Sequence, residues 1–173
     1  MTDSITTQIA LGGGCHWCTE AVFESLRGVC CVDQGWAASV GEHSAYSEAV
    51  LLDFNDHEID LETLLEIHLL THSSTSKHSM RGKYRSAVYV SNDGQRQSVE
   101  LCLGELQNNF DKPLVTKVLP LSGFKSNEQY QNYYYQDPNK LFCQRHIAPK
   151  LTLILSRFSK HTKLDKVNSA LRL

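Results

Sequence analysis

Apolar positions along the 173-residue chain follow two repeats, the two-residue alternation of strands and the 3.6-residue period of helices. Short apolar runs predict strands over residues 8–11, 29–36, 48–54, 86–90 and 114–119. The helical period predicts helices over residues 17–26, 60–68 and 95–109. A further helix is expected where Ser126 can cap the segment NEQYQNYYYQ, which ends before Asp137-Pro138.

Helices and strands alternate in this pattern, but some neighbouring strands have no helix between them. That order predicts an α+β fold in two layers, in which one mixed β-sheet is covered by helices. We expect a single domain over residues 1–173, because no repeat, low-complexity run or Pro/Gly-rich linker interrupts the chain. Residues 73–83 are predicted to form a polar loop, and residues 152–173 a flexible C-terminal tail.

Composition and charge narrow the classes of function. Hydrophobic residues make up 41% and charged residues 21% of the chain, and the net charge is −2, so no general attraction to nucleic acid or to a membrane surface is expected. No stretch approaches the roughly 20 apolar residues of a membrane span, and residues 1–11 lack the basic and apolar regions of a secretory signal peptide. We therefore expect a cytoplasmic protein whose six cysteines are reduced thiols, one or two of them reactive.

The segment LGGGCHWCTEAVF places Cys15 between the end of a predicted strand, three glycines and the start of a predicted helix. Cysteine is a nucleophile as the thiolate, and a free thiol with a pKa near ~8.5 is mostly protonated at neutral pH. The free N–H groups and partial positive charge of a helix N-terminus favour the anion, and glycines let backbone and substrate approach closely. Cys15 is therefore a candidate nucleophile, and a buried cysteine in a glycine turn is the alternative.

The motif GCHWCTEAVF resembles the signature of the A-type peptide methionine sulfoxide reductases, in which glycine, the nucleophilic cysteine, phenylalanine and tryptophan are followed by a glutamate. Five further segments resemble the same family in the same order: AYSEAVLLDF, LLEIHLLTH, GKYRSAVYV, EQYQNYY and LFCQRHIAPKL. Together the matches extend from about residue 8 to residue 151. The resemblance implies the methionine sulfoxide reductase A fold, of ferredoxin-like type, and the reduction of methionine S-sulfoxide.

This resemblance implies a reaction in three steps. A thiolate attacks the sulfoxide sulfur while the oxygen takes up a proton, which leaves a cysteine sulfenic acid and releases methionine. A second thiol forms a disulfide with the sulfenic acid, and an external thiol system, typically thioredoxin, reduces that disulfide. The implied substrates are oxidised-methionine peptides or free methionine sulfoxide, and no cofactor or metal is expected.

The family motifs also imply a role for particular residues. Cys15 matches the nucleophile, Glu48 the acid, and Tyr84 the tyrosine that donates to the sulfoxide oxygen. A carboxyl group retains a proton at neutral pH only where burial disfavours its charged form, so Glu48 is expected to be half-buried beside Cys15. Trp17 is expected to form an apolar wall for the S-methyl group, and Glu20 to act as a charge in the first helical turn.

Two cysteines are candidates for the second, resolving thiol. Cys143 matches the position of a resolving cysteine in the family and lies in a late segment that we expect to be flexible enough to reach Cys15. Cys18 is the alternative, because a C-x-x-C spacing allows a disulfide across one helical turn. The remaining three thiols are expected to be packing residues: Cys30, Cys31 and Cys102.

Several departures from the family pattern affect the predicted site. His16 stands where the family has phenylalanine, which makes one wall of the pocket polar and titratable. The loop GWAASVGEHSAYSE is shorter than the family's and lacks its substrate tyrosine motif, for which Tyr46 is the candidate replacement. Ser79 stands where the family has an aspartate, and HLLT replaces HDPT. The predicted substrate-binding residues are His16, Trp17, Tyr46 and Ser79.

Other functions stay open from the residues alone. A divergent family member could bind methionine-containing peptides with little activity. The sequence Cys15-His16-Trp17-Cys18 also fits a thioredoxin-like disulfide oxidoreductase, whose C-x-x-C motif follows a strand and opens a helix. A metal site would need Cys15, Cys18 and a histidine such as His16 or His78, although structural zinc normally takes four ligands at paired spacings.

Overall fold

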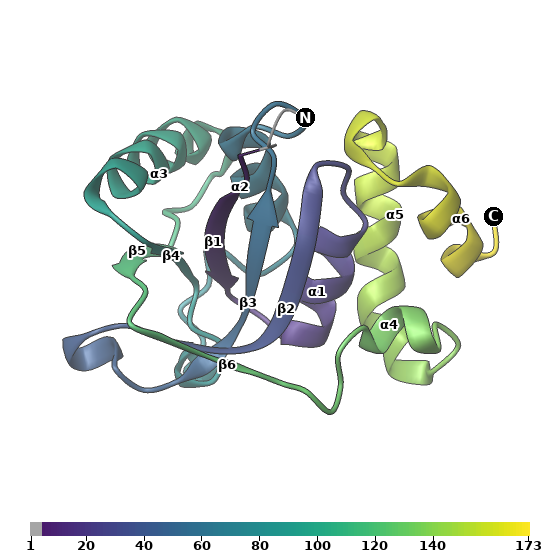
Figure 1. Ribbon diagram of the computed structural model, residues 1–173, viewed down its shortest axis with the longest axis horizontal. Coiled ribbons are helices and arrows are strands. Elements are labelled where there is room, and N and C mark those ends of the chain that lie inside the picture. The colour runs from purple at the N-terminus through teal and green to yellow at the C-terminus, as the bar shows by residue number, and fades with distance from the viewer. Residues whose placement is uncertain (1–4) are drawn as a thin grey trace.

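The computed structural model describes residues 5–173, which contain a six-stranded sheet with its covering helices (Figure 1). The strands are β1 (Thr7–Gly12), β2 (Val29–Ala38), β3 (Ser47–Phe54), β4 (Ala87–Val90), β5 (Lys117–Pro120) and β6 (Gly123–Ser126). Their order in space is β5-β4-β1-β3-β2-β6, with β4 and β5 parallel and the other neighbouring pairs antiparallel. The predicted α+β class with one mixed sheet is therefore confirmed. Part of the N-terminal segment in which no signal peptide was expected, residues 1–4, lies outside the described residues.

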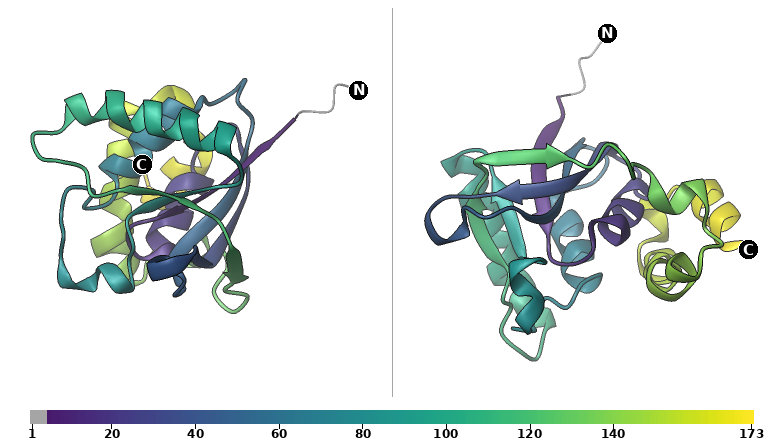
Figure 2. Two further views of the ribbon diagram at one scale, coloured as in Figure 1. Left: turned by 90° about the vertical axis from the view of Figure 1, so that its left-hand side faces the viewer. Right: turned by 90° about the horizontal axis from the view of Figure 1, so that it is seen from below.

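The helices lie over one face of the sheet and at its two ends (Figures 1 and 2). They are α1 (His16–Glu24), α2 (Leu61–Leu70), α3 (Asp93–Leu106), α4 (Tyr133–Gln136), α5 (Ala148–Arg157) and α6 (Leu164–Leu171). Helices α4 and α5 pack against α1, whereas α3 packs against β4 and β5 at the opposite end. No helix in residues 5–173 has the length and apolar composition needed to cross a membrane.

The strand alternation places two different clusters on the two faces of the sheet. On one face a large apolar cluster joins β1, β3 and β4 to α1, α2, α3 and α5, with Leu11, Val50 and Leu65 among its fully buried members. The other face carries small residues and Tyr89. A further cluster, which includes Cys18, Cys143 and Val167, joins α1 to the C-terminal helices. This last contact brings the end of the chain against the helix that Cys15 precedes.

The helix predicted after Ser126 was wrong over most of its length. Residues up to Ser126 form β6, and only Tyr133–Gln136 is α-helical. Tertiary contacts hold the intervening chain in an irregular shape, because the Asn127 amide bonds the Gln34 carbonyl and the Gln131 side chain bonds two backbone carbonyls. Asn132 also adopts a left-handed conformation with φ of 59°, which interrupts a helix.

Two other expectations differ from the structure. Residues 152–173, predicted to be a flexible tail, are helical over most of their length, and Val167 of α6 is fully buried. The cysteines Cys30 and Cys31, expected to be packing residues, are exposed at the start of β2. A register shift between Val29 and Cys31 accounts for the latter, because a bulge turns side chains away from the regular alternation of the strand.

One glycine, Gly35 of β2, allows β6 to pair closely with β2. A Cβ atom at Gly35 would overlap the Lys125 carbonyl of β6, and it would lie 3.0 Å from the Cα of Ser126. Only glycine therefore allows the two backbones to approach at this point. Asn127 directly follows β6. The close pairing of β6 with β2 therefore also positions Asn127, which contributes to the site described below.

We expect the substitution Gly35→Ala to lower the free energy of unfolding by about 1–3 kcal/mol, because overpacking forces the backbone of β6 to move. Urea unfolding measures the effect. Gly104→Ala in α3 is the matched control: no atom lies within 4 Å of the added methyl group, so helix propensity should make that variant up to about 1 kcal/mol more stable. Equal stability changes in the two variants would contradict the role of this close pairing.

Candidate active site

Cys15 lies at the junction that the sequence predicted, between the end of β1 and the first residue of α1. It is the N-cap residue of α1, with a half-buried side chain. The glycines before it pass close to α2 and the loop that follows it, since a Cβ at Gly13 would overlap the His72 ring. The glycine run therefore lets the backbone reach the start of α1 without displacing the residues that support it.

The pKa of Cys15 is lowered from its ordinary value. The largest cause is the hydrogen bond offered by the Cys18 thiol, and the backbone N–H groups of Cys18 and Trp17 act in the same direction. Burial and the charge of Glu48 oppose this shift. Cys15 makes no close capping hydrogen bond, so these donors act on the sulfur at longer range. The pKa of Cys18 is raised in turn, because its proton is held against Cys15 and burial disfavours its own anion.

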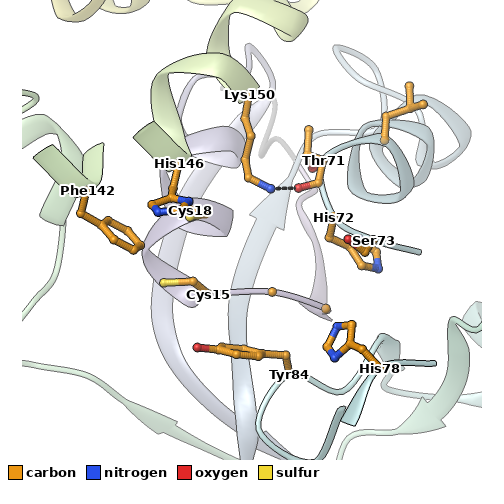
Figure 3. A pocket seen from close by; sticks show the side chains of 13 residues that line it. Cys15, Cys18, Thr71, His72, Ser73, His78, Tyr84, Phe142, His146 and Lys150 are labelled. Carbon is orange, nitrogen blue, oxygen red and sulfur yellow. Dashed lines mark hydrogen bonds between the residues drawn. The ribbon is translucent and has the colours of Figure 1, made fainter. Parts of the chain in front are cut away.

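Two cavities meet at Cys15. The basic cavity, of ≈ 520 Å³, is lined by Cys15 and Cys18 together with His72, His78, His146 and Lys150 (Figure 3). The Lys150 ammonium group donates to the Thr71 carbonyl at its rim. The aromatic cavity, of ≈ 430 Å³, is lined on the other side of Cys15 by His16, Trp17, Trp36, Glu48, Tyr84, Asn127, Tyr130 and Phe142. The sulfur can therefore be reached from two chemically different sides.

Trp17 forms the centre of the apolar wall. Its ring stacks on Tyr133 with the ring centres 4.1 Å apart, and the edges of Tyr130 and Phe142 pack against it. Trp36 from β2 faces His16 edge-on at 5.1 Å. These contacts leave little freedom for the rings, so the aromatic cavity is a rigid seat for a small apolar group.

Glu48 lines the same cavity as Cys15 and is more deeply buried than the sequence suggested, with 6% of its surface exposed. Its Oε1 accepts from the backbone N–H of His16 and lies 3.3 Å from the Nε2 atom of that imidazole. The Lys83 ammonium lies 3.7 Å from Oε2, but the Lys83 side chain is mostly exposed and adds little. The carboxyl group is thus held between a helix start, an imidazole and a surface lysine.

Tyr84 lines both cavities. Figure 3 shows its hydroxyl group on the same side of the site as the Cys15 sulfur. Tyr84 and Cys15 therefore border the same two cavities.

Of the four predicted substrate-binding residues, the structure brings two into the aromatic cavity and leaves two outside. His16 and Trp17 line it. Tyr46 is 41% exposed and packs under the Lys125 ammonium beside Gly123, away from both cavities. Ser79 is exposed at the start of a short 3-10 turn (Ser79–Gly82), and its neighbour His78 lines the basic cavity instead. The shortened loop thus turns its tyrosine towards β6 and not towards Cys15.

The two candidate resolving thiols lie in different surroundings. Cys18 lines the basic cavity one helical turn after Cys15. Cys143 is 0% exposed inside the cluster that joins α1 to the C-terminal helices. It begins a π-helical turn (Cys143–Ile147) that continues into α5, so the segment expected to be flexible is helical.

Several lining residues could not be found from motifs. Trp36 and Asn127 reach the aromatic cavity from β2 and from the residue after β6. Their spacing in the sequence carries no signal, because the sheet order brings them together. Phe142 and Lys150 have a local signal, since both belong to the segment LFCQRHIAPKL that the family resemblance covers.

The buried His68 and the half-buried His72 support the glycine run. His68 donates from Nε2 to the Gly12 carbonyl at 2.9 Å, and His72 donates from Nδ1 to the His68 carbonyl and accepts from Ser86. Burial lowers the pKa of His68 to about 4 and that of His72 well below its ordinary value. Both rings are therefore neutral at neutral pH.

Comparisons with known proteins agree with this geometry. The family model described as peptide methionine sulfoxide reductase matches residues 7–163. The chain is 34% identical to the peptide methionine sulfoxide reductase MsrA of Acinetobacter baumannii strain SDF over 174 residues, which covers 92% of this chain and 99% of that protein.

Solved structures share the fold. Mxr1 of Saccharomyces cerevisiae in reduced form aligns with a TM-score of 0.69 at 19% identity, covering 83% of this chain and 92% of that one. Mxr1 in complex with Trx2 aligns with a TM-score of 0.58 at 19% identity, covering 76% and 86%. Among residues 5–173, no three His, Cys, Asp or Glu side chains are grouped as metal ligands would be.

The substitution His68→Gln should reduce the acid sensitivity of the fold, because glutamine can still donate to the Gly12 carbonyl but does not titrate. With the pKa of His68 lowered from 6.5 to about 4, the unfolded chain binds its proton first as the pH falls. The stability that the neutral ring contributes is fully present above pH 6.5 and is lost towards pH 4, by an amount on the order of 3 kcal/mol.

Urea unfolding of both proteins at neutral pH and near the lower limit of that range measures this difference. The free energy of unfolding should decrease less in the variant than in the wild type. Protonation of His72 also lowers the stability as the pH falls, but it does so in both proteins. An equal decrease would show that His68 is not held neutral by the fold.

Proposed function

The chain belongs to the peptide methionine sulfoxide reductase family, and we propose that Cys15 is the nucleophile of its reaction, the reduction of methionine S-sulfoxide to methionine. One observation carries the assignment: the thiol whose pKa is lowered at the start of α1 shares a cavity with a buried carboxyl group and an aromatic wall. We propose that residues 1–173 act as one reductase domain, on free or peptide-bound substrate.

The first step transfers the oxygen atom. The Cys15 thiolate attacks the substrate sulfur, and the sulfoxide oxygen takes a proton from the side of the cavity occupied by Glu48. The substrate sulfur gains two electrons and leaves as the thioether, while the Cys15 sulfur loses two and becomes a sulfenic acid. Tyr84 donates a hydrogen bond to the oxygen as its negative charge develops. The position of Tyr84 on both cavity walls supports this role.

The S-methyl group of the substrate is held by the aromatic cavity. The Trp17 ring, stabilised by Tyr133 and Phe142, offers an apolar surface next to the sulfur. Apolar contact removes water from the reacting sulfur and orients its lone pair and oxygen with respect to Cys15. In this arrangement Trp36, and not Tyr46, supplies a further aromatic ring to the cavity that holds the substrate.

The second step is a disulfide between Cys15 and Cys18. Cys18 follows Cys15 by one helical turn, it lowers the pKa of Cys15, and both thiols line the basic cavity. Attack of Cys18 on the sulfenic acid forms the disulfide and releases water. Cys143 is the alternative, but it has to leave a fully buried position in a helical turn before it reaches Cys15.

The third step returns both thiols through an external dithiol of the thioredoxin type. Cys15 and Cys18 both line the basic cavity (Figure 3), which is the approach that we infer for that reductant. Crystallisation of the yeast relative Mxr1 with Trx2 supports a partner of this class.

Replacement of Cys15 by Ser should reduce the rate with S-sulfoxide to background, because a hydroxyl group is not ionised at neutral pH and cannot accept the oxygen. The assay uses the separated S and R sulfoxides with dithiothreitol as the reductant, and the wild type should reduce the S form. Cys30→Ser, at an exposed thiol of β2, should retain the wild-type rate. Reduction by the Cys15 variant would end the assignment.

The resolving thiol can be identified by one turnover without external reductant. In the wild type and in Cys143→Ser, mass spectrometry should find a disulfide that joins Cys15 and Cys18 within one peptide. In Cys18→Ser the sulfenic acid should persist long enough to be trapped by a carbon nucleophile such as dimedone. Persistence in the Cys143 variant, with a normal disulfide in the Cys18 variant, would assign the step to Cys143.

A further inference from the structure

The imidazole of His16 is buried inside the aromatic cavity, at the position where the site departs from the resembled family. The side chain is 4% exposed and lies between the rings of Trp17 and Trp36. Its Nδ1 lies 2.7 Å from the carbonyl oxygen of Gly35 in β2. A carbonyl oxygen only accepts hydrogen bonds, so Nδ1 carries a hydrogen atom and donates it. Nε2 is therefore the ring atom that can either carry a proton or present a lone pair.

Two groups face Nε2, the Glu48 Oε1 at 3.3 Å and the Asn127 Nδ2 at 3.5 Å. The orientation of the Asn127 amide follows from Gln34, whose NH₂ group donates to the Glu20 carboxylate and to the Tyr130 carbonyl. The Gln34 oxygen then accepts from Asn127 Nδ2 at 3.2 Å. Asn127 therefore directs its NH₂ group, and not its oxygen, towards this side of the imidazole.

The imidazole and the Glu48 carboxyl group have one proton between them in this geometry. If neither group were protonated, two lone pairs would face each other across 3.3 Å in a buried place, and if both were, two hydrogens would meet. We propose that His16 and Glu48 share one proton and that this pair supplies it to the sulfoxide oxygen when Cys15 attacks. The inference rests on the proposed reductase reaction, and it makes His16 a positioning residue that holds the proton for Glu48.

An imidazole extends the pH range over which the site keeps this proton. An isolated carboxyl group loses its proton near pH ~4.3 and an isolated imidazole near pH ~6.5, and attraction between imidazolium and carboxylate further opposes the loss. Phenylalanine, which the resembled family has at this position, holds no proton.

The other titratable groups around the pair act in both directions. The Lys83 ammonium, 3.7 Å from Oε2, favours the carboxylate, but its side chain is mostly exposed. The Asn127 NH₂ group that faces Nε2 favours the neutral imidazole and so places the shared proton on Glu48. Anionic Cys15 on the same cavity wall favours retention of the proton. Tyr84 lines this cavity with a hydroxyl group, and Glu20 acts only through the amides that orient Asn127.

The proton balance of the first step then closes. The Cys15 thiolate, the sulfoxide and the shared proton react together to give the sulfenic acid and the thioether. The substrate sulfur is reduced by two electrons, the Cys15 sulfur is oxidised by two, and the proton becomes the sulfenic hydroxyl hydrogen. The pair is left as neutral imidazole and carboxylate, and it takes up one proton from water before the next turnover.

Nitrogen-15 NMR of the reduced, histidine-labelled full chain tests the shared proton without turnover. In the wild type, Nδ1 of His16 should stay protonated while Nε2 titrates. In Glu48→Gln, Nε2 should lose its proton about one pH unit lower or more, a tenfold decrease in proton affinity. An unchanged titration in that variant, or a ring that titrates at Nδ1, would overturn the proposal.

Kinetics test whether the shared proton is used. The rate of sulfenic acid formation in a single turnover should rise as Cys15 ionises and fall when the pair loses its proton. In His16→Gln, which keeps a polar side chain that does not titrate, the fall should begin about one pH unit lower, so that the variant is about tenfold slower on the alkaline side and closer to wild type on the acid side. His16→Phe should behave in the same way.

A uniform decrease at every pH would show a merely structural role and would overturn the proposal, as would parallel pH profiles. The two proposals fail separately. A wild type that does not reduce S-sulfoxide, but whose Nε2 titration depends on Glu48, would remove the reductase assignment and leave the shared proton in place. If the His16 variants do not fold, the comparison of wild type with Glu48→Gln still decides the question.

Discussion

The site depends on one close approach, in which the glycine run that leaves β1 passes against the His72 ring before α1 begins. A side chain at Gly13 would overlap that ring, and the imidazole of His68 bonds the Gly12 carbonyl. Because the backbone fits into this narrow space, Cys15 arrives at the start of α1, where the Cys18 thiol and backbone N–H groups lower its pKa. A single packing constraint thus decides the position of the Cys15 thiol and brings it next to the groups that lower its pKa.

A chain of hydrogen-bonded, buried polar groups supports the wall of the aromatic cavity. It runs through Glu20, Gln34, Asn127, His16 and Glu48. Glu20 also accepts from the backbone N–H groups of Asn132 and Tyr133, although burial outweighs these bonds and raises its pKa to about 7. Buried polar groups require partners, so these contacts fix the irregular segment that carries Tyr133 against Trp17. The aromatic wall and the Glu48 carboxyl group, to which we assign the substrate and the proton, are therefore supported by the same network.

The two cavities divide the proposed chemistry by side. The aromatic cavity suits a neutral sulfoxide with a methyl group, because its rings exclude water and its polar groups gather at Glu48, His16 and Tyr84. The basic cavity contains Cys18 and Lys150, whose charge lowers the pKa of Cys18 against the larger effects that raise it. Oxygen transfer and thiol exchange can then occur at one sulfur from different directions, without a large movement of the chain.

The sequence by itself determined the elements whose signals are local. The alternation over 48–54, the capped helix after Asp60 and the glycine-led thiol at Cys15 were predicted and are present, since strand period, capping and helix-end chemistry need only neighbouring residues. Tertiary structure alone decided that Ser126 ends a strand and that an irregular segment follows it. It also decided that Tyr46 and Ser79 lie outside the cavities and that Cys143 is buried. Trp36 and Asn127 likewise reach the aromatic cavity only through the fold. These depend on which strands pair and which helices pack, and contacts between residues about a hundred positions apart leave no trace in local spacing.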